Sequence, residues 1–336
     1  MCLAVVAVAV VFSCSTAYAG VYHSGANLVC QDCHNMHYSG THDYTGGGPI
    51  TLGGGGPHVY LLKDTLANIC LSCHDGQDET VGGNAPDVKG AHGPAVHVRE
   101  AGSLTTGAGP YEDYKGHTIG SVAVAPGGAW SNASGLACMD CHEPHGTPNY
   151  RNLQYKPGGV AADRLVSEVT GGANDLTKDV WENSTGIANV QYAVGNVKWN
   201  EPSTTASAMA NWCKACHTNF HGAGGDANMG GASGGDPNDY PTSAAAWKRH
   251  PTSDVNIGAN ANKHSDNPGW MANASWVPAM SASGTWPNAD NTPFCLSCHK
   301  AHGHTNPFGL NYDDESTAAL EDGTALNETC RQCHNK

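Results

Sequence analysis

The stretch Cys138-Met139-Asp140-Cys141-His142-Glu143-Pro144-His145 carries the pattern around which this chain is organised. Two cysteines three positions apart, with a histidine directly after the second, form the CxxCH motif of c-type haem attachment. The thiols become thioethers on the haem vinyl groups, and the histidine becomes an axial ligand of the iron. The motif occurs six times, at Cys30/Cys33/His34, Cys70/Cys73/His74, Cys138/Cys141/His142, Cys213/Cys216/His217, Cys295/Cys298/His299 and Cys330/Cys333/His334. We therefore expect six covalently bound haem c groups, with their iron.

Two other uses of paired cysteines fit this pattern less well. A zinc site also uses CxxC pairs, but it closes a tetrahedron with four ligands and does not require a histidine at one fixed place after each pair. A thioredoxin-like dithiol would lie in a single βαβ context and would not recur six times. The cysteines outside the motifs are Cys2 and Cys14, and both lie in the N-terminal leader.

Residues 1–19 have the features of a signal peptide. Leu3 to Phe12 is an apolar run, and Ala17-Tyr18-Ala19 is a small-x-small cleavage site before Gly20. The run is too short to cross a bilayer as a helix, and no other segment is apolar enough, so we expect no membrane span. We expect residues 20–336 to be secreted, as an extracellular or cell-surface protein, and to form a single hexahaem domain.

The composition argues against an ordinary apolar core. The chain has 43 Gly and 18 Pro but only 4 Phe in 336 residues, and typical globular chains are richer in apolar side chains. Covalent haem would supply the missing apolar bulk. We expect a multihaem cytochrome c fold of mostly coil and turns, with a helical turn at each motif, few other short helices and minimal strand. Val160–Val169 and Thr317–Leu326 are at best short helices, and Val190–Trp199 at best a short strand.

The formal net charge of −14 is a poor match for nucleic acid or for an anionic membrane surface. We therefore expect no nucleic-acid partner. Acidity favours solubility and contact with cationic partners.

Second axial ligands are expected among the remaining histidines. The 19 histidines less six motif histidines leave 13. Four follow a motif closely, and from there a side chain cannot return to the far face of its own haem but can reach a neighbouring one: His37, His145, His221 and His302. His117 and His250, each upstream of a motif, are the best candidates for two more positions, with His23 and His264 in reserve and His97 below them. We expect His42, His58, His92 and His304 to face solvent.

Methionine is the competing axial ligand, but none of the seven recurs at a fixed spacing from a motif. All-bis-histidine ligation is therefore expected. It leaves the iron without an open position, which suits electron transfer and predicts no catalytic residue.

In these motifs and histidines, the chain resembles the hexahaem outer-surface c-type cytochromes of metal-reducing bacteria, the subunits of extracellular cytochrome nanowires. The resemblance lies in the ordered histidines around the motifs. The matching stretches are His23-Ser24-Gly25, His34-Asn35-Met36-His37, Lys115-Gly116-His117, His142-Glu143-Pro144-His145, Trp212-Cys213, His217 to His221, Arg249-His250-Pro251, Cys295 to His302 and the closing Cys330 to Lys336. Residues 46–58 and 146–210 match little, and Asp75-Gly76 stands where the family can carry another histidine.

The resemblance implies a chain wrapped round a linear file of six haems in alternating parallel and T-shaped pairs. It also implies a homopolymer in which His37 ligates the Cys295/Cys298 haem of a neighbouring copy. In this arrangement a histidine that follows one motif ligates the haem two motifs earlier. Within the chain, His145 would then ligate haem 1, His221 haem 2 and His302 haem 3. His117 and His250 would then serve haems 4 and 6.

Three functions remain open at this point. The first is extracellular electron transfer by a conductive filament, with other redox proteins or extracellular acceptors as partners. The second is a monomeric periplasmic or cell-surface electron shuttle. The third is a multihaem reductase, which is disfavoured because such enzymes generally need an iron with a free position, whereas every motif here ends in histidine and spare histidines are plentiful. We therefore expect an electron carrier and not an enzyme.

Overall fold

The structure is a computed structural model, and it describes residues 23, 29–35, 41–44, 48–51, 58–74, 88, 101–105, 115–166, 207–222, 249–250, 252–253, 293–304 and 307–310. The predicted signal peptide, the sixth motif, the segments 190–199 and 317–326, and His37, His92, His97 and His264 lie outside these residues. Of the segment expected to be at best a short helix at 160–169, residues 160–166 are described and contain no helix.

Three of the described helices are single turns made of the CxxC residues themselves: α1 (Cys30–Cys33), α3 (Cys138–Cys141) and α6 (Cys295–Cys298). Each turn is held at its start by the side chain of its third residue. That side chain accepts a hydrogen bond from the backbone N–H of the residue before the first cysteine, which a short turn would otherwise leave unpaired. The bonds are Val29 N–H to Asp32 (2.6 Å), Ala137 N–H to Asp140 (2.8 Å) and Phe294 N–H to Ser297 (3.1 Å).

The second and fourth motifs lie at the ends of slightly longer helices, α2 (Leu66–Leu71) and α4 (Ala208–Cys213). Here the cap is a hydroxyl upstream of the motif, the type of side chain that stabilises a helix N-terminus. Thr65 accepts from the Asn68 N–H (3.3 Å) and Ser207 accepts from the Ala210 N–H (3.0 Å). The expected helical turn is therefore present at every motif within the described ranges.

The remaining regular structure is sparse. Strands β1 (Thr41–Tyr44) and β2 (Gly48–Thr51) form an antiparallel pair in which Thr41 opposes Thr51 and Tyr44 opposes Gly48. Short 3-10 turns are η1 (Val59–Leu61), η3 (Tyr150–Asn152), η4 (Pro157–Gly159) and η6 (Pro307–Gly309). The expectation of few short helices, little strand and much coil is confirmed for the described residues.

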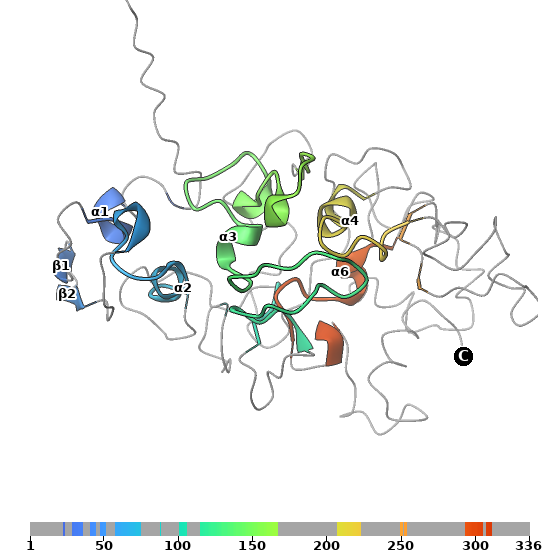
Figure 1. Cartoon of the computed structure of the whole chain (residues 1–336), viewed down its shortest axis with the longest axis horizontal. Helices are drawn as coiled ribbons and strands as arrows, with labels where there is room; N and C mark the ends of the chain where they lie inside the picture. Colours follow the sequence, from blue (N-terminus) through green and yellow to red (C-terminus); the bar gives the residue numbers. More distant parts are fainter. Residues whose placement is uncertain are drawn as a thin grey trace, which may run out of the picture.

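The helices follow one another along the long axis of the molecule in chain order, from α1 at one end to α4 and α6 past the middle (Figure 1). The buried apolar cluster joins η3, α4 and α6. Its members are Tyr150, Leu153, Val166, Ala208, Met209, Ala210, Phe294 and Leu296. No helix in the described part of the chain is long and apolar enough to cross a membrane.

Candidate haem-ligation sites

Each histidine of the first four motifs faces one other histidine across a gap of nearly constant width. The ring centroids are separated by 6.1 Å for His34 and His145, 6.2 Å for His74 and His23, 6.1 Å for His142 and His302, and 6.0 Å for His217 and His117. A metal–imidazole nitrogen bond is about 2.0 Å and the nitrogen lies about 1.1 Å from its ring centre, so two imidazoles on one ion have centroids roughly 6 Å apart. The four gaps therefore fit an iron held from both sides.

Hydrogen bonds determine which ring nitrogen of the motif histidines is free to ligate a metal. Four of these histidines have Nδ1 against a backbone carbonyl. The bonds run from His34 to Tyr60 (2.9 Å), His142 to Arg151 (3.0 Å), His217 to Pro126 (2.9 Å) and His299 to Phe308 (2.8 Å). A carbonyl oxygen only accepts, so Nδ1 carries the hydrogen and Nε2 keeps a lone pair. This is the arrangement of a histidine that ligates a metal through Nε2.

The opposing histidines are oriented in the same way. Nδ1 of each donates to a backbone carbonyl: His23 to Pro144 (3.1 Å), His117 to Ala301 (2.7 Å) and His302 to Gly102 (3.3 Å). His145 differs, because its Nδ1 lies 3.4 Å from a carboxylate oxygen of Glu143. In the pairs His142–His302 and His217–His117, both members thus present Nε2, the nitrogen that would bind an iron.

Burial keeps several of these imidazoles neutral, which is the ligating form. It lowers the pKa of His117, His142 and His299, and it lowers the pKa of His302 to about 3. For His302 the nearby His142 and His117 act in the same direction, since like charges in neighbouring rings disfavour protonation. Burial therefore favours the neutral, ligating form of these four imidazoles.

The carbonyls that orient His34, His142 and His299 share an unusual backbone. They belong to Tyr60, Arg151 and Phe308, whose φ angles are +58°, +52° and +58°. The residue two positions later is a buried leucine that forms a β-bridge with the motif histidine: Leu62 with His34, Leu153 with His142 and Leu310 with His299. Three segments of unlike sequence therefore build the same support behind the first, third and fifth motifs.

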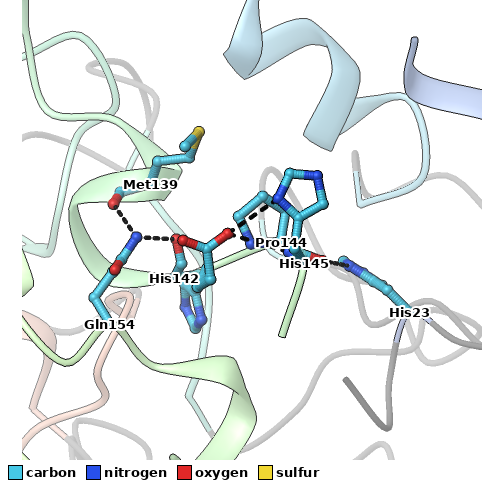
Figure 2. Close-up of polar contacts among 7 residues, drawn as sticks. His23, Met139, His142, Pro144, His145 and Gln154 are labelled. Carbon is cyan, nitrogen blue, oxygen red and sulfur yellow. Dashed lines mark hydrogen bonds and ion pairs between the residues drawn. The ribbon is translucent and has the colours of Figure 1, made fainter. Parts of the chain in front are cut away.

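The stretch 138–145 contributes to three pairs at once, and Figure 2 shows its His142, Pro144 and His145 together with His23. His142 belongs to the third motif and faces His302, His145 faces His34 of the first motif, and the Pro144 carbonyl orients His23, which faces His74 of the second. The side chain of Gln154 holds the stretch in place by donating to the carbonyls of Met139 (3.2 Å) and His142 (3.1 Å).

The thiols link consecutive motifs in chain order. A hydrogen bond to Cys138, with burial, raises the pKa of Cys70, and a hydrogen bond to Cys295, with burial, raises that of Cys213. Burial, followed by the charge of a neighbouring thiol, raises the pKa of Cys33 (beside Cys73) and raises that of Cys141 to about 12 (beside Cys216). The first cysteines of motifs 2 and 3, and those of motifs 4 and 5, therefore lie close enough for a hydrogen bond to shift their pKa values, and the second cysteines of motifs 1 and 2, and of motifs 3 and 4, lie close enough for their charges to interact.

Three expected partners lie where the sequence analysis put them: His145 opposite His34, His302 opposite His142, and His117 opposite His217. The resemblance implied His221 as the partner of haem 2, but the structure places His23, a reserve candidate, opposite His74. The ring of His221 has its Nδ1 2.8 Å from the Thr252 hydroxyl. His250 is exposed.

The expectation that His58 faces solvent is wrong. Its side chain is only 16% exposed, and its Nε2 lies 4.0 Å from the buried carboxylate of Asp64. The turn that follows His58, η1, is joined to the first motif by the Asn35 N–H, which donates to the Leu61 carbonyl (2.7 Å). His304 is partly buried, with its N–H donating to the Lys115 carbonyl (3.1 Å). His42 lies on β1.

The sequence did not predict the groups that accept hydrogen bonds from Nδ1 of these histidines. Glu143 carried a signal, because it stands two residues before a candidate ligand. The carbonyl acceptors carried none, since any residue type supplies a backbone carbonyl.

Comparison with known proteins agrees with this chemistry. A family model described as a doubled CXXCH motif matches residues 287–336. The chain is 25% identical to the C-type cytochrome OmcS of Geobacter sulfurreducens over an alignment of 374 residues, which covers 89% of this chain and 82% of that protein. Two solved structures also align, the OmcS nanowires (20% identity, TM-score 0.44, 93% of this chain and 94% of that one) and the Outer Membrane Cytochrome S filament (18%, 0.41, 93% and 99%), both from the same organism. The resemblance drawn from the flanking histidines is confirmed, and the chain is similar to a multihaem c-type cytochrome with covalently attached haem.

Proposed function

We propose that this protein transfers electrons outside the cell as a six-haem cytochrome that polymerises into a conductive filament. The observation that carries the proposal is the set of four facing histidine pairs, all with the centroid spacing of a bis-imidazole iron. The 25% identity to the C-type cytochrome OmcS supports electron transfer by c-type haem.

The proposal assigns the ligands of the first four haems by the facing pairs. These are His34 with His145, His74 with His23, His142 with His302, and His217 with His117. For haem 5 we propose His299 with His37 of a neighbouring copy. For haem 6 we propose His334 with His250 or His221. Attachment is through the twelve motif cysteines: Cys30, Cys33, Cys70, Cys73, Cys138, Cys141, Cys213, Cys216, Cys295, Cys298, Cys330 and Cys333.

Haem iron, when bound, supplies a centre that exchanges single electrons between the ferric and ferrous states. The facing imidazoles of the first four motifs would hold such a centre from both sides and would leave no position for a substrate. The cysteine sulfur atoms of consecutive motifs also lie near one another, in the order in which the motifs occur in the sequence. Closed axial positions and a continuous order of motifs support conduction over bond-making chemistry.

The filament is tested by electron microscopy of the secreted protein beside a His37→Ala variant. We expect filaments from the native protein and separate subunits from the variant, with one haem per subunit becoming able to bind carbon monoxide after reduction. His58→Ala is the matched control, since His58 belongs to no proposed pair, and it should leave filaments intact.

Two outcomes would contradict the proposal and favour another function. Native protein that stays monomeric at all concentrations would favour the electron shuttle. Native, assembled protein that binds carbon monoxide at a reduced haem would reveal an open iron and favour a reductase.

A further inference from the structure

Three chain segments cross at glycines that leave no room for a side chain. Gly303 forms one β-bridge with Gly102 and another with Gly116. A Cβ atom on Gly116 would lie 2.5 Å from the Gly303 Cα and 2.5 Å from the His302 carbonyl oxygen, and one on Gly303 would lie 2.7 Å from the Ser103 carbonyl oxygen. These distances are far inside van der Waals contact. We call Gly102, Gly116 and Gly303 the glycine crossing.

The glycine crossing carries two of the facing histidines. His117 directly follows Gly116, and His302 directly precedes Gly303. The two are joined by the backbone, because the His117 N–H donates to the His302 carbonyl (2.8 Å), while the His302 N–H donates to the Ala101 carbonyl (2.7 Å).

The crossing segments also orient both rings. Nδ1 of His117 donates to Ala301, on the segment that carries His302 (2.7 Å). Nδ1 of His302 donates to the carbonyl of Gly102 itself (3.3 Å). Neither ring can therefore keep its direction if the three segments separate, because each takes its acceptor from a segment other than its own.

The pairs they belong to lie on consecutive motifs. His302 faces His142 of the third motif and His117 faces His217 of the fourth. We infer that the glycine crossing positions the distal ligands of haems 3 and 4 as one unit, so that disturbing it opens both irons together. This inference rests on the ligand assignment of the proposed function and adds a coupling between two haems that the assignment alone does not contain.

The test is Gly116→Ala in the full-length haem-loaded protein. The φ angle of Gly116 lies outside the left-handed range, so alanine is penalised there by the steric clash and not by its backbone angle. We expect two haems per subunit to bind carbon monoxide after reduction with dithionite. Gly120→Ala is the matched control: its φ is +88°, which strains alanine, but no atom lies within 4 Å of the added methyl group. It should open no haem.

Two single-ligand variants separate this inference from the proposed function. His117→Ala and His302→Ala should each open one haem per subunit. If neither opens a haem, the ligand assignment and the coupling both fail. If each opens one but Gly116→Ala opens none or one, the assignment stands and the coupling is overturned.

A measurement on the native protein covers the case in which Gly116→Ala does not fold. Hydrogen exchange followed by mass spectrometry should show residues 101–105, 115–118 and 300–304 exchanging as one cooperative unit. Rates that differ by more than about tenfold between these segments would mean that they open separately, and would overturn the inference.

Discussion

His23 lies opposite His74, with 6.2 Å between the ring centroids and 41° between the ring planes, and its Nδ1 is held by the Pro144 carbonyl at 3.1 Å. The two histidines belong to different parts of the sequence, and the group that orients His23 belongs to a third. The second motif therefore depends on a residue near the N-terminus and on the loop that follows the third motif.

His23→Ala is expected to open one haem per subunit, that of the second motif, because it removes the imidazole facing His74. Carbon monoxide binding to the reduced protein, and high-spin absorption in the oxidised protein, measure the opening. His221→Ala is the comparison. It should leave haem 2 low-spin, and a haem 2 that opens in His221→Ala but not in His23→Ala would contradict the assignment.

Glu143→Gln is expected to raise the reduction potential of haem 1. The carboxylate lies 3.4 Å from Nδ1 of His145, and a charged acceptor there increases electron donation from the imidazole to the iron, which favours the ferric state. Glutamine keeps an acceptor and removes the charge. A spectroelectrochemical titration should show one of the component potentials move upward.

Asp163→Asn is the control for that titration, because it removes an exposed carboxylate that pairs with Lys156 at 3.7 Å. It should leave the set of potentials in place. Equal shifts in the two variants would attribute the effect to overall charge and not to the contact with His145.

Substitutions at Tyr60 test the need for a positive φ angle without disturbing side-chain packing, because Tyr60 is 77% exposed while its φ is +58°. Tyr60→Val should destabilise the folded protein by roughly 1–2 kcal/mol, since a β-branched residue is strained in the left-handed region. Tyr60→Gly fits that conformation and should keep the carbonyl directed at His34. Thermal unfolding followed at the haem absorption band compares the two, and a valine variant as stable as the glycine variant would contradict the role of the loop.

A chain in which all twelve motif cysteines are replaced by alanine should be largely unfolded. The buried apolar cluster of the described residues is small and joins only η3, α4 and α6, so side-chain burial alone does not offset the entropy lost on ordering the chain. Far-ultraviolet circular dichroism of the secreted, haem-free variant measures this. A spectrum matching that of the haem-loaded protein would contradict it.

The short helices were predictable because the motif itself encodes them. Two cysteines must lie on one helical turn to reach one haem edge, and Asp32 and Asp140 are capping residues at the right distance. The spacing of His145 and His302 predicted that each reaches a neighbouring haem, since a histidine three residues after a motif cannot reach its own, but which haem it reaches came from the resemblance. His23 had no such spacing, and the sequence offered it only as a reserve candidate.

The supports of the histidines were not predictable from the sequence. Tyr60, Arg151 and Phe308 adopt positive φ angles that usually indicate glycine or asparagine, and only the requirement to face a motif histidine explains their conformation. The glycine crossing unites residues 102, 116 and 303, and no local pattern connects them. In a chain with 43 glycines, the three glycines of the crossing could not be told from the others by sequence.

The order of the neighbouring cysteines has a consequence for the direction in which electrons would flow. First cysteine meets first cysteine, and second meets second, at the boundaries between the first five motifs. Each of these boundaries joins cysteines from the same place in their motifs, so the attachment points alone distinguish neither direction along the chain. In the proposed filament, we therefore expect the direction of net electron flow to be set by the donors and acceptors at the two ends.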